Sequence, residues 1–188
     1  MPSIVAKAAL MTLALVVATS ATSADAQTRR AREPREPKET TTALPPVPVD
    51  KRDSMVAAAG PFKGKPYWLT LAQCGGTYFK LNIFYTDAAV HARIKPDPKA
   101  TTEYTRKLTH AIKTATIYFN GAERILMADR GIERVDAVLI YDPQSRAMGD
   151  RLKTIEAAEA AAQTCPALYE ACQAAYPKAC SEHPSPTS

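Results

Sequence analysis

The sequence predicts an all-α protein, an up-and-down bundle of three long helices plus a short C-terminal helix, stapled by disulfides. Two observations predict the helices. Apolar residues recur at spacings of three and four, and no stretch has the apolar–polar alternation that is typical of a strand. A third observation, four cysteines in a chain that starts like an exported protein, predicts the disulfides.

Residues 1–26 have the pattern of a cleavable signal peptide. Lys7 is the only charged residue before Asp25, and an apolar run of 11 residues follows it. Ala24-Asp25-Ala26 then supplies the small residues of a cleavage site. The alternative, a retained membrane anchor, is disfavoured because a spanning helix needs about 20 apolar residues. We expect cleavage after Ala26, no transmembrane segment in the mature chain, and a periplasmic or secreted location.

Residues 27–61 are expected to form a disordered arm. The segment is rich in proline and charge and has no aromatic residue, since all thirteen aromatic residues lie at Phe62 or later. Such a segment cannot bury enough apolar surface to offset the entropy of ordering. We interpret the arm as a spacer, so its deletion should leave the stability of the domain unchanged. The alternative is an arm that contacts the envelope or a partner.

The helical domain, residues 62–180, opens with a predicted helix over 67–91. Its polar residues form one narrow stripe, and the rest of its surface is apolar. A helix of this kind is expected to be central and covered by several neighbours. Gly75 and Gly76 lie inside it, where each costs about 1 kcal/mol relative to alanine. We interpret them either as a place where a backbone or small ligand comes close beside Cys74, or as a kink.

Two further long helices are predicted over 99–129 and 132–163. The first has the most regular apolar spacing in the chain, typical of antiparallel bundle packing, and Gly131 fits its C-terminal cap. The second keeps one apolar phase across Pro143, so we expect a single helix that is kinked at this proline.

A short fourth helix is predicted over 165–176. Pro166 suits its first turn, and Pro177 ends it. The tail over 181–188 is expected to be flexible.

The cysteines Cys74, Cys165, Cys172 and Cys180 are expected to form two disulfides and leave no free thiol. A Cys165–Cys172 bond is excluded within one helix, because seven helical residues separate the Cα atoms by about 10 Å. We prefer Cys74–Cys165 with Cys172–Cys180 over Cys74–Cys172 with Cys165–Cys180. The alternative use of these residues is a zinc site built on Cys180 and His183, which an oxidising compartment disfavours.

No catalytic or cofactor motif stands out. The patterns of serine hydrolases, zinc proteases, dinucleotide-binding proteins and covalent haem are absent from the sequence. Residues 60–66 look like a phosphate loop, but the spacing is wrong and no Ser or Thr follows the lysine. We therefore expect a non-catalytic protein with no cofactor and no metal.

The charge of the chain argues against one class of partner. The formal net charge is +5, and acidic and basic residues are mixed along the chain. Mixed charge is typical of a solvated surface, whereas a nucleic-acid-binding protein would show a dense basic stripe. We therefore expect no nucleic-acid partner.

One set of polar residues faces the predicted core: Tyr78, Asn82, Tyr85, Tyr118 and Tyr141. Buried hydroxyls and amides need hydrogen-bond partners, so we interpret the set as an internal polar network. The alternative is a pocket between helices. Our leading hypothesis is an exported, non-catalytic binding or envelope-accessory protein whose partner is an unidentified protein or envelope component. The alternative hypothesis is a small-ligand carrier or an enzyme that uses this pocket.

Overall fold

The computed structural model describes residues 45–57, 60–95 and 97–180, and these are mostly helical. The elements in chain order are α1 (Tyr67–Ile94), α2 (Pro98–Arg130), α3 (Arg134–Arg151), α4 (Ile155–Ala162), α5 (Cys165–Ala175) and α6 (Pro177–Cys180). The described residues contain no strand beyond a single isolated bridge between Met55 and Pro66. The all-α prediction is therefore confirmed at the level of secondary structure.

Three of the sequence predictions fall outside these ranges. The signal peptide at 1–26, the first part of the arm at 27–44 and the tail at 181–188 all lie outside the described residues. Among the helices that are described, none has the length and apolar character needed to cross a membrane.

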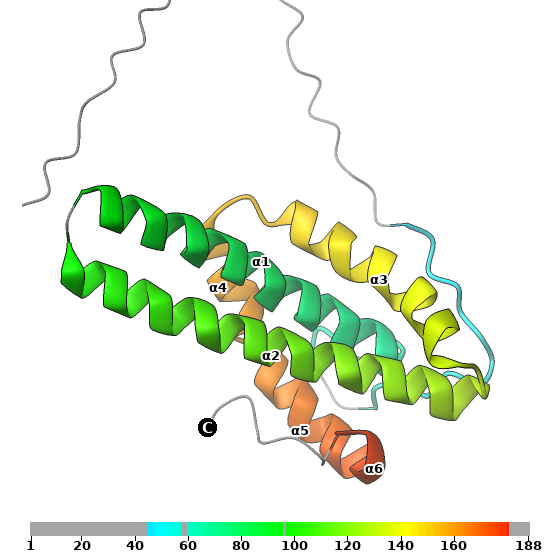
Figure 1. The fold of residues 1–188 in the computed structure, drawn as a ribbon. Coiled ribbons are helices and arrows are strands. Elements are labelled where there is room, and N and C mark those ends of the chain that lie inside the picture. The colour runs from blue at the N-terminus through cyan, green and yellow to red at the C-terminus, as the bar shows by residue number, and fades with distance from the viewer. Residues whose placement is uncertain (1–44, 58–59, 96, 181–188) are drawn as a thin grey trace, which may run out of the picture. The chain divides into compact units, whose positions relative to one another are not determined.

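Helix α1 lies at the centre of the fold. It runs antiparallel to α2 along most of its length, with α3 beside it (Figure 1), and it also contacts α4 and α5. Its residues Trp68 and Leu71 are fully buried, as are Tyr118 and Ile125 of α2. The prediction that this helix is central is therefore confirmed.

Local signals set both ends of α2. The Asp97 carboxylate accepts a hydrogen bond from the backbone N–H of Ala100 at 2.9 Å, and Pro98 occupies the first turn. Gly131 closes the helix with a left-handed φ of 66°, a conformation that glycine adopts without steric cost. The predicted bounds of 99–129 and the predicted cap are both close to the observed ones.

The prediction of a single third helix over 132–163 is wrong. Helix α3 passes through Pro143 without interruption, but it ends at Arg151, and α4 begins only at Ile155. The break arises because the Thr154 hydroxyl accepts a hydrogen bond from the N–H of Ala157 and so starts a new helix. The bundle consequently has two long helices, α1 and α2, followed by four shorter ones in the described residues.

Both disulfides have the preferred pairing. Cys74 of α1 is bonded to Cys165 at the start of α5, with their Cα atoms 5.8 Å apart. Cys172 of α5 is bonded to Cys180 of α6, with a Cα–Cα distance of 6.0 Å. No cysteine is free, so Cys180 is not a ligand of the zinc site considered above.

Residues 45–57, called the N-terminal strap from here on, correct the predicted boundary of the arm. The Asp53 side chain is fully buried and accepts two hydrogen bonds from the Arg130 guanidinium, both at 2.7 Å. Val56 is also buried, and its N–H donates to the carbonyl oxygen of Lys65. This part of the predicted arm therefore packs on the helices, because one buried ion pair and one buried apolar side chain anchor it.

Candidate functional site

Helices α1 and α3 come into backbone contact at Gly76. A Cβ atom at this position would overlap the carbonyl group of Ser145 in α3. At Gly75 a Cβ atom would overlap the ring of Phe119 in α2. Of the two interpretations of this glycine pair, the close approach of a neighbour is confirmed, and the neighbours are a backbone and an aromatic ring.

A groove of about 460 Å³ lies beside this contact, between α1 and α3. Its apolar lining comes from Phe79 and Ile83 of α1 and from Phe119 of α2. Phe79 and Ile83 are 47% and 46% exposed, which leaves about half of each large side chain open to solvent. The groove therefore offers apolar surface that no described residue covers.

The rim of the groove carries charges of both signs. Lys80 lies on the α1 side, and Asp142, Arg146 and Asp150 lie on the α3 side. The Nε atom of Arg146 donates to the Asp142 carboxylate at 2.7 Å, one helical turn away. Because an exposed pair of this kind contributes little to stability, its charges stay available to a partner.

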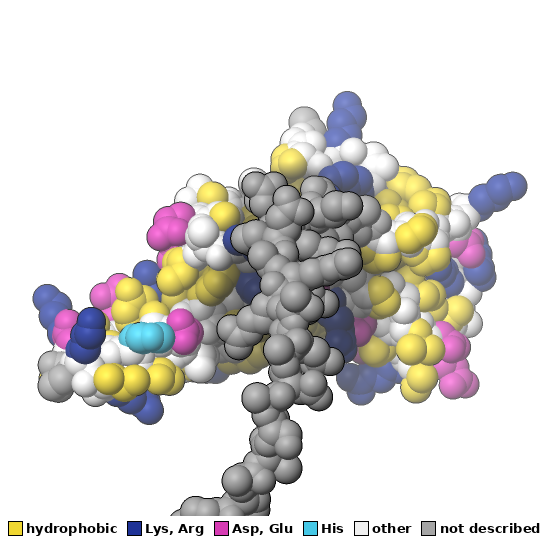
Figure 2. All heavy atoms as spheres, turned by 90° about the horizontal axis from the view of Figure 1, so that it is seen from above, with side chains coloured by type: hydrophobic (Ala, Val, Ile, Leu, Met, Phe, Trp, Pro, Cys, Tyr) yellow, Lys and Arg dark blue, Asp and Glu magenta, His cyan; other side chains and the backbone are white. Residues whose placement is uncertain are grey.

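Further exposed apolar residues lie along α1 beyond the groove, on the far side of the exposed Thr86. Phe79, Ile83, Val90 and Ile94 are all exposed, and their spacings of four, seven and four place them on one face of the helix. We call these four residues the α1 stripe. In the view from above, hydrophobic side chains lie at the surface among charged ones (Figure 2). Several neighbouring helices cover α1, as expected, but the α1 stripe stays exposed.

Part of the polar stripe of α1 is buried instead. Thr70 and Thr77 are 0% and 1% exposed. Each hydroxyl donates to a backbone carbonyl of the preceding turn, at 2.9 Å to Tyr67 and 3.0 Å to Gln73. A threonine satisfied in this way can be buried like an apolar residue. The orientation of α1 is therefore not the one that hydrophobicity alone suggests.

Two of the predicted site tyrosines pack on each other in the core. The rings of Tyr78 and Tyr118 stack with their centroids 5.6 Å apart, and Tyr169 meets Tyr118 edge-on at the same distance. Within the described residues, the Tyr118 hydroxyl has no hydrogen-bond partner. Burial raises the pKa of Tyr118 well above its ordinary value, so this phenol stays protonated.

Tyr85 and Asn82 have partners within the fold. The Tyr85 hydroxyl donates to the Glu159 carboxylate at 2.6 Å; burial, followed by this contact, raises the pKa of Tyr85. The Asn82 amide donates to the carbonyl oxygen of Leu108 at 3.1 Å. Both side chains therefore make internal hydrogen bonds of the kind expected for a polar network.

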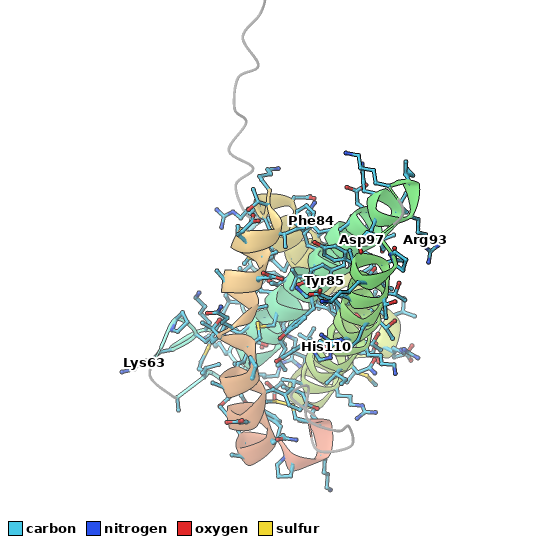
Figure 3. All side chains as sticks on the ribbon, turned by 90° about the vertical axis from the view of Figure 1, so that its left-hand side faces the viewer. Lys63, Phe84, Tyr85, Arg93, Asp97 and His110 are labelled. Atoms are coloured by element: carbon cyan, nitrogen blue, oxygen red, sulfur yellow. A yellow bond between two sulfur atoms is a disulfide. The ribbon has the colours of Figure 1, made fainter. Side chains whose placement is uncertain are left out.

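The predicted residues do not line a single pocket. Tyr78 and Tyr85 share a cavity of only about 100 Å³ with His110 (Figure 3 labels Tyr85 and His110). Tyr141 stacks on Phe119, at a centroid distance of 5.8 Å, and does not line that cavity. Such a volume falls well below the roughly 300–1,000 Å³ of ordinary ligand pockets.

Within the described part of the chain, no group of three His, Cys, Asp or Glu residues is placed to hold a metal ion. His91 is exposed beside Asp87, and His110 lies against the edge of the Tyr78 ring. His183, the other half of the zinc alternative, lies outside the described residues.

Comparison with known proteins gives no match to a protein family, a curated protein or a solved structure.

Proposed function

We propose that this chain is an exported, non-catalytic binding protein that holds an amphipathic helix of a partner protein. The partner helix lies in the groove between α1 and α3 and continues along the α1 stripe. The export part of the proposal is supported by the signal-peptide pattern and by the two disulfides, which persist in oxidising compartments.

The α1 stripe is the observation that carries this proposal. Single exposed apolar residues are ordinary, but a groove with an exposed apolar lining indicates a site of interaction. The stripe repeats along one helical face, and its first two residues line a groove of about 460 Å³. An amphipathic helix matches such a surface, because its own apolar side chains recur at three and four.

The charged rim favours a protein partner over a membrane surface. Lys80 and Arg146 stand with Asp142 and Asp150 around the apolar lining. A mixed rim gives orientation and specificity to a partner that carries complementary charges. A surface of anionic lipid would instead favour cations alone.

Photo-crosslinking in the producing cell tests the proposal. Phe79 and Ile83 are each replaced by p-benzoylphenylalanine, and Leu139 of α3 receives the same replacement as a control. Leu139 is 70% exposed but does not line the groove. We expect one adduct of defined mass at both groove positions and none at position 139. Equal labelling at all three positions, or no adduct at 79 and 83, would contradict the proposal.

A further inference from the structure

A second cavity, of about 340 Å³, lies beside the Cys74–Cys165 disulfide. Its walls come from the loop before α1, from α1 itself, from the end of α3 and from the junction of α4 and α5. It shares no lining residue with the groove between α1 and α3. The cavity is therefore a separate feature, assembled by the tertiary fold and the disulfide.

The lining has an apolar part. Phe62 and Met148 are partly buried, and Cys74 and Cys165 are only 2% and 1% exposed. Methionine and disulfide sulfurs are soft, polarisable groups that pack well against an aromatic or aliphatic body. A purely ionic ligand would leave this surface without a partner.

The cavity also has a polar side, which comes from the polar stripe of α1. Gln73 is half-buried and lines the cavity, and Thr164 lines it from the segment between α4 and α5. The Thr77 hydroxyl is already used within α1, because it donates to the carbonyl oxygen of Gln73. The Thr164 hydroxyl is used in the same way, because it donates to the carbonyl oxygen of Ala161 at 3.1 Å. The Gln73 side-chain amide can donate to a bound oxygen atom.

Every charged residue that lines this cavity is a cation. Lys65 belongs to the loop before α1, and Arg151 is the last residue of α3. Neither takes part in an ion pair within the described residues. Two cations from separate elements over an uncharged floor favour an anion, and a guanidinium matches the geometry of a carboxylate.

We propose that this cavity binds a small organic acid. Its carboxylate is held by Lys65 and Arg151 at the mouth, and its apolar body packs on Phe62, Met148 and the disulfide. This site would give the protein a ligand-binding activity that is independent of the partner-binding groove.

A titration followed by NMR tests the site. The ¹⁵N-labelled protein is titrated with 4-phenylbutyrate and, separately, with 4-phenylbutan-1-ol, which keeps the same body without the charge. We expect the carboxylate to bind at least about tenfold more tightly than the alcohol, which corresponds to about 1.4 kcal/mol. The largest amide shifts should fall at the cavity residues, and the amides beside Phe79 and Ile83 should not move.

Three variants make the test specific. Lys65→Gln and Arg151→Gln should each weaken 4-phenylbutyrate binding about tenfold, because each removes a charge-assisted contact. Lys63→Gln is the matched control from the same loop, since its side chain points away from the helices (Figure 3) and does not line the cavity. All three residues are exposed, so the melting temperature should be unchanged. Equal binding of acid and alcohol, shifts elsewhere in the protein, or no binding at millimolar probe would overturn the proposal.

Discussion

Replacing Asp53 by Asn is expected to lower the free energy of unfolding by about 3–5 kcal/mol, because it leaves the Arg130 guanidinium buried without a counter-charge. The Asp53 side chain is fully buried, and Arg130 lies over the ring of Trp68, 5.3 Å from its centroid. Chemical denaturation of the two proteins measures the difference. Asp50→Asn serves as the control, since the Asp50 carboxylate bonds to the exposed side chain and the backbone N–H of Arg52, and the change should alter stability little.

The loss of stability caused by Asp53→Asn should become smaller as the pH falls. Burial raises the pKa of the Asp53 carboxyl, but the hydrogen bonds from Arg130 and from the backbone of Asp50 outweigh it, so the pKa lies below its ordinary value. A carboxyl with a lowered folded-state pKa stabilises the protein above its unfolded pKa of about 3.9 and loses that contribution as pH falls. The difference in the free energy of unfolding between wild type and Asp53→Asn should therefore decrease below about pH 4. A gap that widens in acid would contradict this account.

Gly76→Ala is expected to destabilise the protein by about 3 kcal/mol, because the new methyl group would overlap backbone atoms. The overlapping atoms belong to the Ser145 peptide, which cannot change rotamer to make room. The two helices would have to move apart, and thermal unfolding measures the cost.

Gly149→Ala is the matched control for that substitution. Gly149 faces α1 across the same helix contact, but a Cβ there would lie 3.4 Å from the Gly76 carbonyl oxygen, an ordinary contact. The change should be neutral or should stabilise α3 by up to about 1 kcal/mol, the helix preference of alanine over glycine. Equal losses for Gly76→Ala and Gly149→Ala would mean that the close contact at Gly76 is not the cause.

The features that local signals encode could be predicted from the sequence. The bounds of α2 follow from Asp97, Pro98 and Gly131, which act within one turn of the helix ends. Helix geometry excludes a Cys165–Cys172 bond, and a chain that turns after Pro177 can return Cys180 to Cys172, which favours the observed pairing of Cys74 with Cys165. In these cases the deciding interactions join residues close in sequence or restrict distances through a single helix.

The end of α3 was missed although its signal is local. Leu152 is buried, so the apolar phase continues past Arg151 into the next helix. That continuity concealed the hydroxyl cap at Thr154, which decides where α4 begins. Periodicity reports which residues face the core, but it does not report whether the backbone between them is helical.

The N-terminal strap and the groove depend on contacts that composition does not encode. Asp53 meets Arg130 across 77 residues of sequence, and nothing in the proline-rich neighbourhood of Asp53 indicates this pairing. Phe79 and Ile83 look like core residues by type, but they are 47% and 46% exposed, because no described helix covers them. Long-range packing decides which apolar residues of a helix are buried, whereas periodicity only identifies the residues that could be.

The central claim is that the α1 stripe binds a partner. The most direct test uses the partner segment that is cross-linked at position 79. Calorimetry measures its affinity for the wild type, for Phe79→Asp and for Leu139→Asp. Phe79 is the aromatic residue of the stripe and should act as a hot spot, so Phe79→Asp should weaken binding by about 2 kcal/mol or more, roughly thirtyfold. Leu139→Asp, on exposed surface outside the groove, should bind like the wild type. Three equal affinities would contradict the account.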